Sequence, residues 1–73
     1  MADLNVDSEV TGVVTKIARA VGERVERDEP VMFVEIMKME LPVPAPSDGT
    51  IAKLLVSEGE TIAEGQTVAI LRP

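Results

Sequence analysis

The stretch Gly12-Val13-Val14-Thr15-Lys16-Ile17 returns later in the chain, in related form, as Gly49-Thr50-Ile51-Ala52-Lys53-Leu54. The offset of 37 positions aligns the surrounding sequence as well, without a gap. Further pairs at this offset are identical, among them Gly22 with Gly59, Glu23 with Glu60, and Val31 with Val68. Because turn positions and the apolar positions between them agree together, the chain is predicted to fold as two similar units.

Each unit has the composition of short β-strands. Val is the most frequent aliphatic residue, with 11 copies, and β-branched side chains favour a pleated sheet over a helix. Five Gly and five Pro are spread along the chain, as expected where turns separate short elements. Strands are expected over 10–18, 24–26 and 31–36 in the first unit, and over 50–56, 61–63 and 68–71 in the second.

Turns are predicted at matching places in the two units. Gly22-Glu23 and Gly59-Glu60 each supply a glycine, which adopts a positive φ without steric cost. At the next corner Asp28 occupies the position that Gly65 has in the second unit, and Asp tolerates the left-handed conformation. The Pro-rich segment 42–49 cannot be a central strand, so we expect an edge strand that runs into a turn.

The segment 32–41 allows two interpretations. Met, Glu, Lys and Leu are good helix formers, and Pro30 suits a helix start. Its first residues, however, align with 68–71, which end two residues before the C-terminus and cannot form a helix. Pro42 would also stop a helix after about three turns. We therefore predict strand, turn and strand, with Lys38 at the tip.

These elements predict an all-β fold. Two interlocked units of about four strands each, related by an approximate twofold axis, would form two four-stranded antiparallel sheets that face each other as a sandwich or flattened barrel. The connecting hairpin, 35–41, would then lie opposite the two chain ends.

The composition limits the chemistry of this single domain, which spans 1–73. The chain contains no Cys, His, Trp or Tyr, so disulfides, thiolate or imidazole metal sites and the commonest general base are excluded. A net charge of −6 and one aromatic residue, Phe33, argue against binding to nucleic acid or to anionic membranes. We expect a cytoplasmic domain with no catalytic residues, no metal, no nucleic-acid partner and no membrane partner.

The predicted hairpin reads Glu35-Ile36-Met37-Lys38-Met39-Glu40, which is unusual for a solvated turn. Unbranched thioether side chains are adaptable apolar surface, common where a partner docks. A solvated lysine is protonated at neutral pH, and flanking carboxylates stabilise its charged form. Lys38 is thus not an activated nucleophile, and a modifying enzyme would have to supply both the activated acyl donor and the proton acceptor.

Met37-Lys38-Met39, set between two glycine-containing half-repeats, resembles the biotin carboxyl carrier (biotinyl/lipoyl attachment) domain family. The resemblance covers almost the whole chain from about Val6. It implies a flattened barrel (barrel-sandwich hybrid) with covalent biotin in amide linkage to Lys38, and it implies that Met37 and Met39 are recognised by the modifying enzyme.

The same resemblance implies a non-catalytic carrier, monomeric in isolation. Its partners would be a biotin protein ligase, a biotin carboxylase and a carboxyltransferase. The carboxyl acceptor would be an acyl-CoA such as acetyl- or propionyl-CoA, ahead of pyruvate or urea. Tethering makes delivery of the carboxyl group an intramolecular event at high effective concentration.

Three other interpretations remain open. A lipoyl carrier of a 2-oxo acid dehydrogenase or glycine cleavage system would share the barrel, but that family prefers Asp-Lys at the tip, so Met37 favours biotin. The barrel could also be an unmodified interaction module, with Lys38 a solvated turn residue. Catalysis by the chain itself is the least favoured interpretation.

Overall fold

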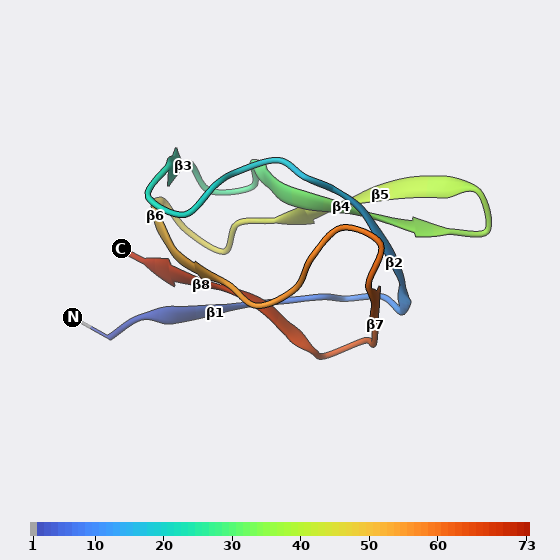
Figure 1. Cartoon of the computed structure of the whole chain (residues 1–73). Helices are drawn as coiled ribbons and strands as arrows, with labels where there is room; N and C mark the ends of the chain where they lie inside the picture. Colours follow the sequence, from blue (N-terminus) through green and yellow to red (C-terminus); the bar gives the residue numbers. More distant parts are fainter. Residues whose placement is uncertain (1) are drawn as a thin grey trace.

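The computed structural model describes residues 2–73 and consists of β-strands joined by turns, with no helix in that range (Figure 1). No helix among these residues is long and apolar enough to cross a membrane. The strands are β1 (Leu4–Asp7), β2 (Gly12–Ile17), β3 (Arg24–Val25), β4 (Pro30–Ile36), β5 (Met39–Pro44), β6 (Gly49–Leu54), β7 (Thr61–Ile62) and β8 (Thr67–Arg72).

The strands form two four-stranded antiparallel sheets, ordered β1-β8-β6-β3 and β5-β4-β2-β7. Exchanging each strand with its counterpart in the other unit, β1 with β5, β2 with β6, β3 with β7 and β4 with β8, converts one order into the other. Each unit gives two strands to each sheet, so the units are interlocked as predicted. The all-β class, the two sheets and the approximate twofold axis are confirmed.

The repeat extends to irregularities within the strands. The register shifts between Val14 and Lys16 in β2, and between Ile51 and Lys53 in β6. The extra residues, Thr15 and Ala52, are equivalent under the 37-residue offset. Since a bulge bends a strand and strengthens its twist, matching bulges give the two sheets the same curvature.

The predicted turns have the expected backbone. Gly22 and Gly59 have φ of 92° and 90°, and Asp28 and Gly65 have φ of 72° and 84°. Asp28 therefore adopts the conformation that glycine takes in the other unit. The strands that were given a range are all present, although β2 and β6 are shorter than the apolar patterns suggested, and β1 was given no range.

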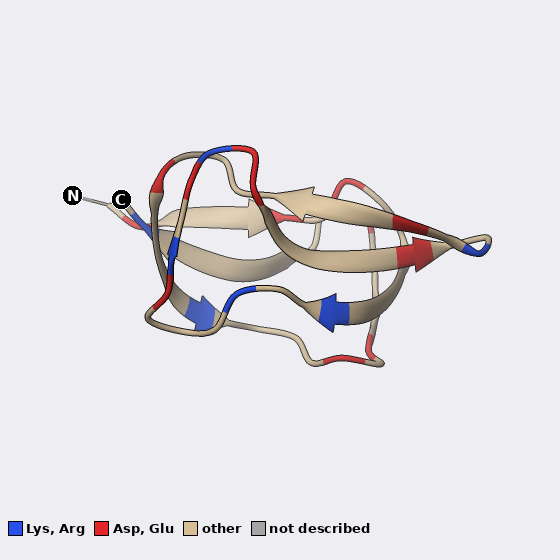
Figure 2. Cartoon of the chain, turned by 90° about the horizontal axis from the view of Figure 1, so that it is seen from above, with Lys and Arg blue, Asp and Glu red and all other residues tan. Residues whose placement is uncertain are grey.

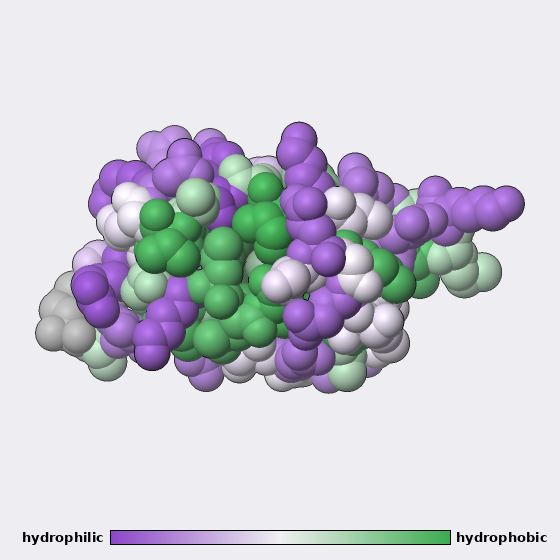
Figure 3. All heavy atoms as spheres, viewed as in Figure 1, coloured by the Kyte–Doolittle hydropathy of each residue, from purple (hydrophilic) through white to green (hydrophobic). Residues whose placement is uncertain are grey.

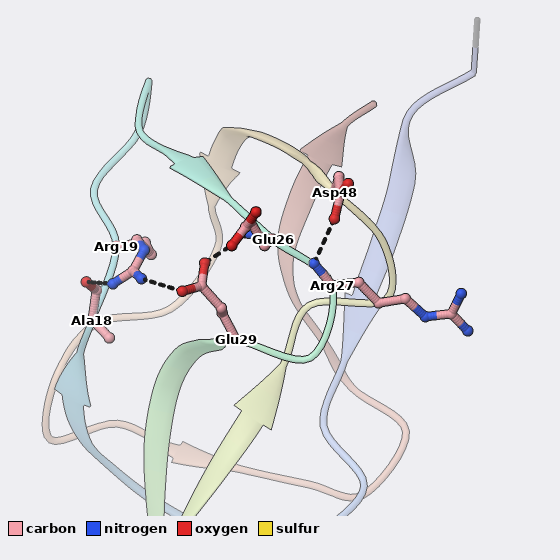
Figure 4. Close-up of polar contacts among 6 residues, drawn as sticks. All are labelled: Ala18, Arg19, Glu26, Arg27, Glu29 and Asp48. Carbon is pink, nitrogen blue, oxygen red and sulfur yellow. Dashed lines mark hydrogen bonds and ion pairs between the residues drawn. The ribbon is translucent and has the colours of Figure 1, made fainter.

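The corner between β3 and β4 is closed by polar contacts (Figure 4). The Glu29 carboxylate accepts a hydrogen bond from the Glu26 amide at 2.8 Å and pairs with Arg19 at 3.6 Å. In the second unit the Gln66 side chain accepts from the Ala63 amide at 2.9 Å. The acceptor is the charged Glu29 in the first unit and the neutral Gln66 in the second. The fold therefore depends on the geometry of this hydrogen bond and not on the charge of the acceptor.

The core lies between the sheets and is almost entirely aliphatic. Small β-branched side chains fill the narrow gap between two inner faces. The buried apolar residues are Val6, Val14, Val25, Val31, Met32, Val34, Val43, Ala45, Ile51, Val56, Ile62, Val68, Ala69 and Leu71.

Segment 32–41 is strand, turn and strand, so the helical alternative is wrong. Tertiary pairing with β2 outweighs the local helix propensity of its residues. Strand β5 stands at the edge of its sheet, where Pro42 and Pro44 remove donors that another chain could use. The molecule measures 37 × 18 × 18 Å, with the β4–β5 hairpin at one end and both chain termini at the other (Figure 1).

Candidate functional site

The tip of the hairpin is a two-residue turn. Ile36 and Met39 are the last paired residues, which leaves Met37 and Lys38 to connect β4 with β5. Their φ angles are 51° and 65°, as a type I′ turn requires at both central positions. Asn-Gly is the usual sequence for this turn, because side chains with a Cβ resist positive φ. The turn thus holds two bulky residues in a conformation that costs free energy.

The tip side chains project into solvent. Met37 is 91% exposed and Met39 is 60% exposed, and Lys38 is exposed as well. Figure 2 shows the blue segment at the tip of the hairpin, far from the other basic segments. The Lys38 amine is in no ion pair with any of residues 2–73. The arrangement therefore presents one primary amine, flanked by two thioethers, on a narrow projection.

The base of the hairpin is held firmly by β2. A Cβ on Gly12 would collide with the carbonyl oxygen of Glu35 and would lie 2.8 Å from Cγ1 of Val34. Gly12 thus allows β2 to pass close against β4 where the hairpin leaves the barrel. On the other side, β4 is paired with β5 along its whole length, from Pro30 to Ile36. The projection is stiff because its base is packed on both sides of β4.

Two carboxylates stand one residue pair below the turn. Glu35 of β4 and Glu40 of β5 are direct cross-strand partners, and both are exposed. Figure 2 shows them as red segments side by side on the two hairpin strands. Like charges in this arrangement destabilise a sheet. Glu40 is partly relieved, because its Oε2 accepts a hydrogen bond from the Thr15 hydroxyl at 2.8 Å.

Two hollows lie away from the amine. One, of about 270 Å³, lies between residues 9–10 and β5, and the other, of about 370 Å³, lies between β1 and the end of β5. Neither is lined by Met37, Lys38 or Met39. Residues 2–73 also contain no group of three or more acidic side chains that could hold a metal ion. The hairpin can present a group to other proteins, and an open tip accommodates a covalent attachment at Lys38 without displacing protein atoms.

The sequence analysis selected Met37, Lys38 and Met39, and in the structure all three lie at the tip of the hairpin. Thr15 was missed, because it acts on Glu40 across 25 residues of sequence. One signal existed: the repeat aligns this threonine with Ala52, so a polar residue in one unit has an apolar counterpart in the other.

Comparison with known proteins identifies the family and agrees with the fold. A family model described as "Biotin-requiring enzyme", for biotin and lipoyl domains, matches residues 8–71. Pyruvate carboxylase of Staphylococcus aureus is 39% identical over 61 residues, which are 84% of this chain but 5% of that protein. The chain therefore spans a small fraction of that relative's length.

Two solved structures superpose closely. Urea carboxylase of Kluyveromyces lactis gives a TM-score of 0.92 at 33% identity, covering 99% of this chain and 6% of the carboxylase chain. The lipoyl domain of the 2-oxoglutarate dehydrogenase complex from Azotobacter vinelandii gives 0.71 at 30% identity, covering 100% and 98% of the two chains. The same barrel thus occurs in a urea carboxylase and in a lipoyl domain.

Proposed function

The chain belongs to the biotin/lipoyl attachment family, and we propose that it is a biotin carboxyl carrier with Lys38 as the attachment site. Domains of this family carry biotin or lipoate covalently on a lysine, as small parts of larger enzymes. The observation that carries the proposal is the exposed Met37-Lys38-Met39 tip on a stiff hairpin. No other lysine of the chain combines a turn position with two flanking methionines.

Attachment requires the neutral form of the amine. Lys38 Nζ would attack the acyl carbon of biotinyl-adenylate held by a biotin protein ligase. The new bond is an amide, the bond from the acyl carbon to the AMP phosphate oxygen breaks, AMP leaves, and the amine's proton passes to a base. A carboxylate is a weak base for an ammonium proton, so the ligase would supply the base.

The residues of the tip suit a carrier. When bound, biotin would accept a carboxyl group at a biotin carboxylase and release it at a carboxyltransferase. The exposed Met37 and Met39 offer adaptable apolar contacts beside the attachment point, and we propose that the ligase recognises them. A narrow projection limits the buried area in each complex, and small interfaces release quickly, as a shuttling carrier needs.

The remaining assignments belong to the same proposal. Residues 1–73 would be one domain, monomeric in isolation, working in the cytoplasm. The carboxyl acceptor would be an acyl-CoA, acetyl- or propionyl-CoA, with pyruvate and urea as the competing outcomes. Purified carboxyltransferases tested against the biotinylated domain would separate these acceptors.

The test is the intact mass of the protein after coexpression with a biotin protein ligase. We expect one biotinyl group per chain, and none in Lys38→Arg, which preserves the charge but removes the nucleophilic amine. Lys16→Arg and Lys53→Arg are the matched controls and should be biotinylated fully. Biotin on the Lys38→Arg protein would overturn the site, and an unmodified wild-type chain would overturn the function.

The second candidate is a lipoyl carrier, which the superposition on a lipoyl domain favours. Lipoylation of the wild-type chain by a lipoate ligase, without biotinylation, would support it. Under the biotin proposal, Met37→Asp should reduce biotinylation and permit lipoylation. An unchanged biotin yield would show that Met37 is not recognised.

A further inference from the structure

The repeat supplies an internal reference for the hairpin base. The positions equivalent to Glu35 and Glu40 are Arg72 and Asp3, at the end of the molecule that carries the chain termini. There the two side chains form an ion pair, with Arg72 Nε 3.3 Å from Asp3 Oδ1. At the hairpin the same place holds two carboxylates, which cannot pair with each other.

Thr15 lies where it compensates for this difference. It is the extra residue of the β2 bulge, and its hydroxyl lies 2.8 Å from Oε2 of Glu40 and 3.3 Å from the carbonyl oxygen of Phe33. One hydroxyl proton serves one acceptor at a time, and the bond to a carboxylate is the shorter and stronger. The equivalent bulge residue in the other unit is Ala52, which has no side-chain donor, and there Asp3 pairs with Arg72 instead.

The hydrogen bond turns Glu40 away from the tip. Thr15 is in β2 and Glu40 is in β5, with β4 between them, so the carboxylate must reach back across the outer face of β4. Without Thr15 the same carboxylate, which follows Lys38 by two residues in the chain, would be free to swing toward the ammonium group. An amine held in an ion pair is protonated and cannot attack an acyl carbon.

We propose that Thr15 is a positioning residue for the Lys38 amine, because it binds Glu40 against sheet β5-β4-β2-β7 and keeps that carboxylate from pairing with the amine. The role rests on the proposed function, since it matters where Lys38 is an acyl acceptor. Among residues 2–73, other charged groups near this face are Glu35 of β4, to which no side chain donates, Lys16 of β2, which stands opposite Phe33, and Glu58, whose Oε2 accepts a hydrogen bond from the Ile17 amide at 2.9 Å.

The experiment measures lysine reactivity directly. The folded protein is treated with a trace of acetic anhydride at pH 7.5 and low salt, and acetylation of Lys38 is divided by that of Lys53, on the other sheet. In Thr15→Val this ratio should fall about twofold, the effect of one exposed ion pair. Thr15→Ser keeps the hydroxyl and should restore the ratio. Ala52→Val, at the equivalent bulge, is the matched control and should leave it unchanged.

The effect must act through Glu40. In a Glu40→Gln background, Thr15→Val should no longer lower the ratio. When Glu40 is present, 1 M salt should reduce the fall in the ratio that Thr15→Val causes, because salt screens exposed ion pairs. Above about pH 11, where most lysines are neutral, the variants should converge. The initial rate of biotinylation by a ligase at pH 7.5 should fall by the same factor as the ratio.

An unchanged ratio in Thr15→Val, or an equal fall in the Glu40→Gln background, would overturn the positioning role. Thermal unfolding of each variant checks that the barrel is intact. Should Thr15→Val fold poorly, the single Glu40→Gln variant tests the idea: its ratio should stay near that of the parent, because Thr15 already holds Glu40 away from the amine, and a raised ratio would show that Glu40 pairs with Lys38 in the parent and would overturn the role. Acetylation needs no ligase, so this result stands apart from the proposed function. A chain that no ligase biotinylates would remove the function while the reactivity ratio still decided the role of Thr15.

Discussion

The two ends of this molecule are formed by equivalent strands, but they differ in how those strands are connected and in the charges that they carry. At one end β4 and β5 are joined by Met37-Lys38 and carry two opposed carboxylates. At the other end the equivalent strands, β8 and β1, stop at the chain termini and carry the Arg72–Asp3 ion pair. At the termini opposite charges are paired, whereas at the hairpin Glu35 and Glu40 stand opposite each other close to the exposed amine of Lys38.

This difference separates what the barrel needs from what the site needs. Features that recur in both units, such as the Gly12/Gly49 pair and the bulges, are requirements of the fold. Features present once, such as the methionine-flanked lysine and Thr15, are not needed to close a sheet, since the other unit closes without them. The internal repeat therefore points to functional residues by their lack of a counterpart.

The largest expected change in stability comes from a residue that both ends share. Gly12→Ala should lower the free energy of unfolding by about 1–3 kcal/mol, because the new Cβ meets the backbone of Glu35 and neither strand can move away. Gly49→Ala should cost a similar amount, since its Cβ would lie 2.6 Å from the carbonyl oxygen of Arg72. Urea unfolding measures both, and a loss at one end alone would break the equivalence of the two ends.

A smaller effect of opposite sign is expected at the turn. Lys38→Gly should raise the free energy of unfolding by about 0.5–1 kcal/mol, because glycine adopts φ of 65° without steric cost. This figure is the net gain after the larger conformational entropy of glycine in the unfolded chain is subtracted. The control is Lys53→Gly in β6, where φ is not positive and the same change should destabilise. Destabilisation by Lys38→Gly would show that the turn stores no strain.

The smallest effect concerns the charges. Glu35→Arg gives the hairpin the opposite-charge pair of the other end and should raise the free energy of unfolding by about 0.2–1 kcal/mol. Arg72→Glu, which copies the hairpin arrangement onto the termini, should lower it by a similar amount. Both differences should shrink in 1 M salt. Salt-independent changes would mean that packing and not charge separates the ends.

Most of the fold could be predicted because its signals are local and occur twice. Gly22 and Gly59 mark turns by their backbone freedom alone, and Asp28 was interpretable because Gly65 occupies its place in the second unit. Segment 32–41 was harder, since local propensity favours a helix, and only alignment with 68–71 identified its first half as strand. The strand ends were less accurate, because apolar residues such as Val10 and Val56 continue the pattern beyond the last paired residues.

The sequence by itself determined the repeat, the turns and the lysine between two methionines, because each depends on the conformational preferences of neighbouring residues. Only the tertiary structure decided which strands stand side by side, that Gly12 presses against Glu35, and that Thr15 reaches Glu40 over an intervening strand. Such contacts join residues far apart in the chain, and their geometry follows from the register and twist of the assembled sheets, which no short stretch of sequence specifies.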